Sequence, residues 1–140
     1  IPITAPEIAD GRVQARADWI RHGACDVARA GVLDIGGITP LLKFTAMCES
    51  LAVPYTLHLG GIASLHVLAT SAMNGWYYER GLLHPNLDID AVPAWLASPL
   101  EIMDSTGMMS LPPGAGLGYD LDDDYLRHHV EVIREARAAH

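Results

Sequence analysis

The sequence predicts an α/β fold in which short buried strands alternate with helices, as in part of a (β/α)8 TIM-like barrel. An irregular extension that ends in a helix is expected to follow. Apolar strand patterns alternate with helical patterns about four times over residues 1–80, which indicates parallel strands and right-handed crossovers. Polar residues follow several strand patterns, where such barrels place their chemistry. After Arg80 the chain becomes rich in Pro, Gly and Asp.

The strand and helix patterns follow one another in chain order. Strands are expected at residues 1–4, 24–30, 53–58 and 75–79. Helices are expected over about 10–22, from 39 to before Pro54, and over about 62–72. In the first helix Val13, Ala17 and Ile20 recur at helical spacing, and Gly23 is placed to end it.

The second helix has the clearest start signal. Thr39 is expected to cap it, with Pro40 at the first helical position. Its apolar stripe consists of Leu41, Phe44, Cys48 and Leu51.

The remainder of the chain is expected to form a second part, residues 81–140. It is irregular up to about residue 121, with one short strand over 108–111. A last helix begins near Asp122, because acidic residues in a first turn suit the helix dipole. Its apolar positions, which would pack it back on the rest of the protein, are Leu126, Val130 and Ile133.

Size and charge limit the possible functions. A complete barrel of this kind needs roughly 250 residues, so 140 residues without an initial methionine predict a fragment, a processed product or half of a split barrel. The net charge of −8, with a single lysine and dispersed arginines, argues against nucleic-acid binding. The sequence has no signal-peptide pattern and no apolar run long enough for a membrane span. Two cysteines without metal or disulfide spacing favour a reduced, cytoplasmic protein.

Three residues near predicted strand ends could carry chemistry. Glu7 could be a metal ligand, or only an acid near a helix start. His58 could transfer protons or be a hydrogen-bonded core histidine, and strand alternation places it on the face of Thr56. Glu79 could form a simple ion pair, or donate a hydrogen bond to a developing oxyanion.

Several short motifs, in this order, resemble the mandelate racemase and muconate lactonizing branch of the enolase superfamily. They are the segments at 1–7, 23–25, 36–39, 53–58, 79–80 and the Pro/Gly-rich loop at 112–118. The resemblance implies the C-terminal half of the barrel domain, with residues 1–80 as strands five to eight. It also implies that residues 81–140 pack back on the barrel and a capping domain.

The resemblance further implies Mg²⁺ as cofactor and a role for each candidate. Glu7 matches the last of three metal-binding acids, His58 the barrel histidine and Glu79 the acid on the last strand. The other two acids and the usual lysine-containing base are absent. Arg29 and Thr56 are expected to contact the substrate.

The match departs from the family at Gly31, where an aspartate usually pairs with the histidine. Asp26 should point to the other face, whereas Asp34 in the following loop could substitute. Without a carboxylate partner, His58 is expected to act as an acid or a substrate contact, not as a base.

The first choice of function is therefore the C-terminal part of a sugar-acid dehydratase acting on a small carboxylate. A racemase or cycloisomerase is the alternative within the same chemistry, and a non-catalytic half-barrel is the alternative from another class. The missing capping domain and first barrel half would lie in the same or another chain, and a homo-oligomer is expected.

Overall fold

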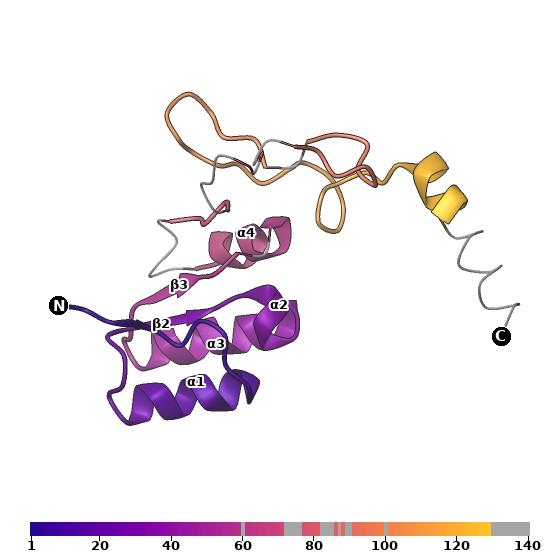
Figure 1. The fold of residues 1–140 in the computed structure, drawn as a ribbon. Helices are drawn as coiled ribbons and strands as arrows, with labels where there is room; N and C mark the ends of the chain where they lie inside the picture. The colour runs from indigo at the N-terminus through magenta and orange to yellow at the C-terminus, as the bar shows by residue number, and fades with distance from the viewer. Residues whose placement is uncertain are drawn as a thin grey trace, which may run out of the picture. The chain divides into compact units, whose positions relative to one another are not determined.

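The computed structural model describes residues 1–59, 61–71, 77–81, 86, 88, 91–99 and 101–129. The chain separates into two compact units, Ile1–Leu82 and Leu83–His140. The first unit contains every labelled strand and helix in Figure 1. All five predicted site residues belong to it.

The first unit is built on a parallel sheet. Within the described residues its strands are β1 (Thr4–Ala5), β2 (Val27–Ala30) and β3 (Tyr55–Leu57), in the order β1-β2-β3. Ala28 lies opposite Tyr55, and Arg29 lies opposite Thr56. Both strand pairs are parallel, as the strand–helix alternation predicted.

Helices connect the strands in sequence. They are α1 (Arg12–Arg21), α2 (Val32–Ile35), α3 (Ile38–Ser50) and α4 (Gly61–Ala69). In Figure 1, α1 and α3 lie side by side along one face of the strands. The three predicted helices are confirmed with somewhat shorter bounds, whereas the short helix α2 was not predicted.

The start of α3 differs from the prediction. The helix begins at Ile38 and follows Gly37, whose backbone φ of 116° favours glycine. Thr39 therefore lies inside the first turn and makes no side-chain cap. Pro40 fits the third helical position as well as the first, because the first N–H groups of a helix have no partner within it.

The hydrophobic core lies between the sheet and its helices. Because side chains alternate along a strand, β2 and β3 point four of them into this core: Ala28, Ala30, Tyr55 and Leu57. The Tyr55 ring packs edge to face against Phe44, with 5.9 Å between the ring centroids. Both cysteines are free, and burial raises the pKa of the Cys48 thiol to about 12. A thiol of that kind packs as a small apolar side chain.

The predicted fourth strand falls partly outside the described residues, which omit Gly75 and Trp76. Residues 77–80 are described, and they do not form a strand. The predicted end of the third helix at Ala72 also lies outside them, and α4 ends at Ala69. The described sheet thus holds three strands, with β1 and β3 at its edges.

The second unit is irregular, as expected. The strand predicted over 108–111 is reduced to one antiparallel bridge between Met103 and Met109, because the Asp104 carboxylate closes a tight turn by accepting the N–H of Met108 at 3.0 Å. Another bridge joins Leu96 to Leu121.

A helical segment covers residues 123–129 of the second unit. Asp122 caps it by accepting the N–H of Tyr125 at 2.7 Å, so the predicted start is confirmed. Val130 and Ile133 lie outside the described residues, and the packing of this helix onto the barrel stays a prediction. No helix within the described part of the chain is long and apolar enough to cross a membrane.

Candidate active site

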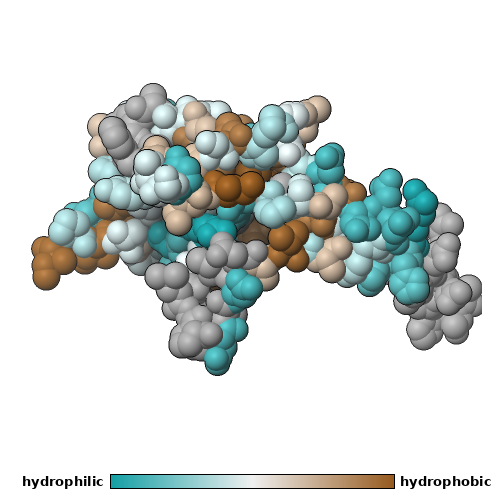
Figure 2. Space-filling model, turned by 90° about the horizontal axis from the view of Figure 1, so that it is seen from above, coloured by the Kyte–Doolittle hydropathy of each residue, from teal (hydrophilic) through white to brown (hydrophobic). Residues whose placement is uncertain are grey.

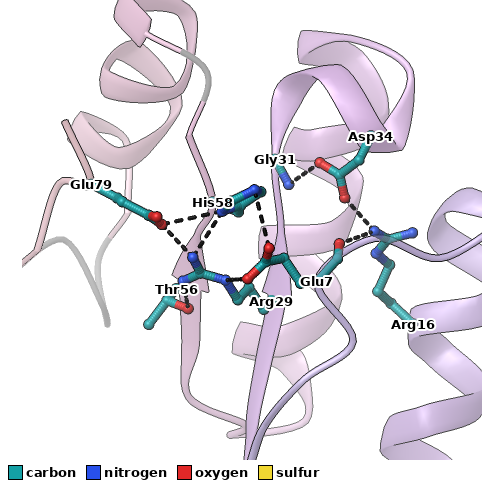
Figure 3. Close-up of polar contacts among 8 residues, drawn as sticks. All are labelled: Glu7, Arg16, Arg29, Gly31, Asp34, Thr56, His58 and Glu79. Atoms are coloured by element: carbon teal, nitrogen blue, oxygen red, sulfur yellow. Dashed lines mark hydrogen bonds and ion pairs between the residues drawn. The ribbon is translucent and has the colours of Figure 1, made fainter. Parts of the chain in front are cut away.

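The candidate site lies where the three parallel strands end. Glu7 is two residues beyond β1, Arg29 lies on β2, and His58 directly follows β3. The N–H of His58 donates to the Ala30 carbonyl at 2.9 Å, which continues the pairing of β2 with β3 to this point. Figure 3 shows these side chains turned toward one another, together with Glu79.

Arg29 is the centre of the site. Its Nε donates to Glu7 Oε2 at 3.1 Å, and its Nη1 donates to Thr56 Oγ1 at 3.2 Å. Its Nη2 contacts His58 Nδ1 at 2.8 Å and forms an ion pair with Glu79. We call Glu7, Arg29, Thr56, His58 and Glu79 the Arg29 cluster. A planar guanidinium with five N–H donors is suited to join several acceptors in this way.

The contact with Arg29 determines how the His58 ring carries its proton. A guanidinium can only donate hydrogen bonds, so His58 Nδ1 must accept. In the neutral ring the proton then sits on Nε2, an assignment that follows from the hydrogen-bond network. Nε2 lies 3.4 Å from Glu7 Oε1, whereas Nδ1 lies 3.3 Å from Glu79 Oε2. The ring therefore lies between two carboxylates, with its Nε2–H on the side of Glu7 and its Nδ1 engaged by Arg29.

Glu79 is ionised in this arrangement. Burial alone would raise its pKa, but the hydrogen bond and positive charge of Arg29 outweigh that effect and hold the pKa of this carboxyl below its usual value. In its present contacts Glu79 accepts hydrogen bonds. To donate a hydrogen bond to an oxyanion, as predicted, Glu79 must be protonated, and this requires Arg29 to leave its ion pair with Glu79.

Two expectations about the histidine partner were wrong. Asp34 does not contact His58, because α2 turns it back so that Oδ1 accepts the Gly31 N–H at 2.6 Å and Oδ2 pairs with Arg16. His58 is also not without carboxylate neighbours, since Glu7 and Glu79 both lie beside it. Asp26 lies elsewhere, as predicted, and accepts the N–H of Ile3 at 2.7 Å.

Sequence-based reasoning missed Arg16, which binds the main chain of the segment that carries Glu7. This side chain on α1 is 0% exposed and donates to the main-chain oxygens of Glu7 and Ala9, both at 2.9 Å. One signal could have revealed it. Arg16 lies three residues after Val13 and four before Ile20, on the apolar face of the helix.

The residues present fit a magnesium ion only as part of a larger ligand set. Glu7 offers one half-exposed carboxylate, of the oxygen type that Mg²⁺ prefers. Within the described ranges no three His, Cys, Asp or Glu side chains come together as a metal site. Glu7 would therefore need further oxygen ligands to hold the ion.

Comparison with known proteins places this chain in a family. Residues 1–125 match the family model for "Enolase C-terminal domain-like" proteins. The chain is 32% identical over 118 residues to chloromuconate cycloisomerase from Pseudomonas putida, covering 80% of this chain and 30% of that relative.

Solved structures agree with this match. The D-glucarate dehydratase from Agrobacterium tumefaciens, complexed with magnesium, is 41% identical with a TM-score of 0.84, covering 91% of this chain and 33% of its own. An isomerase from Streptomyces coelicolor A3(2) is 27% identical with a TM-score of 0.67, covering 97% of this chain and 36% of its own.

The chain spans about a third of the length of these relatives. The small parallel sheet and its helices match the C-terminal part of their barrels, which confirms the predicted fold class. The chain belongs to the enolase C-terminal domain-like family of the enolase superfamily.

Proposed function

We propose that this chain is the C-terminal part of a magnesium-dependent enzyme that removes the proton alpha to a carboxylate, and that the reaction is the dehydration of a sugar acid. The observation that carries this proposal is the convergence of Glu7, His58 and Glu79 on Arg29 at the strand ends. The 41% identity to a D-glucarate dehydratase favours dehydration within the superfamily.

In this proposal Glu7 is one of several ligands of Mg²⁺. The ion, when bound, supplies positive charge for the substrate carboxylate as charge develops on its oxygens. The remaining ligands and the base come from the missing barrel half, in the same or another chain. Glu7 would exchange its contacts with Arg29 and His58 for this role.

His58 is the proposed acid for the departing β-hydroxyl. Its Nε2–H is directed away from Arg29, on the side of Glu7. Arg29 fixes the ring through Nδ1, so the proton available for transfer is the one on Nε2.

Arg29 and Thr56 are the proposed substrate contacts, and Glu79 responds to them. A substrate carboxylate that binds Arg29 would compete with Glu79 for the guanidinium. Glu79, relieved of that charge in a half-buried place, would take up a proton more readily. It could then donate a hydrogen bond to the oxyanion of the substrate.

Replacing His58 tests this proposal. In the assembled enzyme, His58→Asn should lower kcat by about 100- to 10,000-fold, the usual contribution of an acid or base. His22→Asn, an exposed position after α1, should leave kcat unchanged. Proton NMR in deuterated water should reveal a 2-keto-3-deoxy acid as product. Full turnover by His58→Asn would contradict the proposal.

A cycloisomerase or racemase is the second candidate, because the chain is 32% identical to a chloromuconate cycloisomerase. The same NMR experiment separates the two. Isomerisation exchanges the alpha proton for deuterium without loss of water from the substrate.

A non-catalytic half-barrel is the candidate from another class. It is favoured by the single metal-ligand candidate among the described residues. It predicts that His58→Asn and wild type support the same turnover when combined with the rest of the enzyme.

A further inference from the structure

Arg16 is the largest side chain that is fully buried in the described structure. A buried guanidinium is costly unless it is paired and hydrogen-bonded. Its Nη1 donates to the carbonyls of Ala9 at 2.9 Å and Arg12 at 3.1 Å. Its Nη2 donates to the Glu7 carbonyl at 2.9 Å and pairs with Asp34. Within the described residues its Nε has no partner, so the pairing is incomplete.

Two of these contacts, to the carbonyls of Glu7 and Ala9, reach the segment that carries Glu7. Residues 6–10 follow β1 without helix or strand structure, so sheet pairing does not fix them. The Glu7 side chain itself is half exposed. Arg16 fixes the main chain of this segment at the carbonyls of Glu7 and Ala9, and the first of these belongs to the residue that carries the carboxylate.

The other end of the contact network is the junction of β2 with α2. Asp34 accepts the Gly31 N–H at 2.6 Å while it pairs with Arg16. Gly31 in turn lies against His58, since a Cβ at Gly31 would be 2.2 Å from the His58 carbonyl oxygen. The Glu7 segment, Arg16, Asp34, Gly31 and the His58 backbone therefore form one continuous series of contacts, part of which Figure 3 shows.

We propose that Arg16 and Asp34 act as a positioning clamp that sets the Glu7 carboxylate beside the His58 ring. A buried ion pair is often replaceable by apolar residues without loss of stability, so stability alone does not explain why a guanidinium stands on the apolar face of α1. The Arg16–Asp34 clamp links the Glu7 segment, which has no sheet pairing of its own, to the junction of β2 with α2. The inference rests on the proposed function only for the role of Glu7 as a metal ligand.

The test uses NMR on the 140-residue chain, with the His58 ring signals assigned by their loss in His58→Asn. Glu7→Gln should shift the His58 Nε2 signal in wild type, because Glu7 Oε1 lies 3.4 Å away. In Arg16→Met the shift caused by Glu7→Gln should fall below half its wild-type size. Glu79→Gln should shift the ring signals equally in both backgrounds, since Glu79 does not contact the clamp.

Arg21→Met is the matched control, because Arg21 lies on the same helix with an exposed side chain. It should leave the whole effect of Glu7→Gln in place. Arg16→Lys and Asp34→Asn, which keep a buried polar group, extend the test if Arg16→Met fails to fold by circular dichroism. Both should reduce the effect of Glu7→Gln. An undiminished effect in the folded Arg16 or Asp34 variants would overturn the proposal, whatever reaction the enzyme catalyses.

Discussion

At the scale of single residues, the Arg29 cluster depends on one guanidinium that separates two carboxylates and fixes an imidazole. Strand alternation predicted that Thr56 and His58 share a face, and the register of Arg29 opposite Thr56 adds Arg29 to it. The ion pair of Arg29 with Glu79 could not be predicted, because it joins residues 50 positions apart.

Glu79 gives the first prediction at this scale. Glu79→Gln should lower the free energy of unfolding by about 1.5–3 kcal/mol at neutral pH, the usual range for hydrogen bonds to charged groups. The pKa of Glu79 is lowered in the folded state, so this stabilisation is present above the ordinary carboxyl pKa. It is lost as pH falls through the folded-state pKa. Urea denaturation at several pH values should show wild type and variant converging in acid.

Asp18→Asn is the control for this experiment, since the Asp18 side chain is exposed and lies 4.0 Å from Arg21. Its effect should stay within about 0.5 kcal/mol at every pH. A difference between Glu79→Gln and wild type that persists or grows in acid would contradict the account.

At the scale of elements, the sequence pattern predicted β2, β3 and the longer helices, whereas β1 is confined to Thr4–Ala5 and residues 77–80 do not form the predicted fourth strand. It did not predict the connection between β2 and α3. The four-residue helix α2 is too short for a periodic pattern, and it directs Asp34 away from His58. Arg16 was missed for another reason: an arginine in a helix is usually exposed, and its burial depends on Asp34 and the Glu7 segment.

Gly31 gives a prediction for the β2–α2 junction. In Gly31→Ala the new Cβ would lie 2.2 Å from the His58 carbonyl oxygen and 2.7 Å from Asp34 Oδ1. The variant should lose about 1–3 kcal/mol of unfolding free energy, as is typical of overpacking. It should also shift the His58 ring signals in NMR spectra.

Gly23→Ala is the matched comparison, because no atom lies within 4 Å of its added Cβ, although a φ of 61° disfavours alanine. It can lose stability but should leave the His58 signals in place. Unchanged His58 signals in Gly31→Ala would show that the close approach of Gly31 to His58 is not required for the position of the His58 ring.

At the scale of the whole molecule, the chain spans about a third of the length of the relatives it matches. β1 forms an edge of the described sheet, and Ile1 and Ile3 beside it are exposed. Figure 2 shows apolar side chains among the polar ones on the surface. That an open edge accepts another strand is a general property of sheets, and the missing barrel half is its proposed partner.

An open edge predicts self-association of the chain by itself. Sedimentation velocity should show a mass that rises with concentration, and Ile3→Lys should suppress this rise by charging the edge. Leu33→Lys, which changes an exposed apolar residue on α2, should have no such effect. Equal suppression by both variants would attribute the association to general hydrophobicity, and a monomer at all concentrations would argue against an open edge.

The central claim is that the Arg29 cluster contributes to a metal-dependent site that other parts of the enzyme complete. Isothermal titration with Mg²⁺ tests it most directly, on the 140-residue chain alone and after assembly with the missing half. We expect weak or undetectable binding to the chain alone, tight binding after assembly, and loss of that binding in Glu7→Gln. Tight binding by the isolated chain, or full binding by assembled Glu7→Gln, would contradict it.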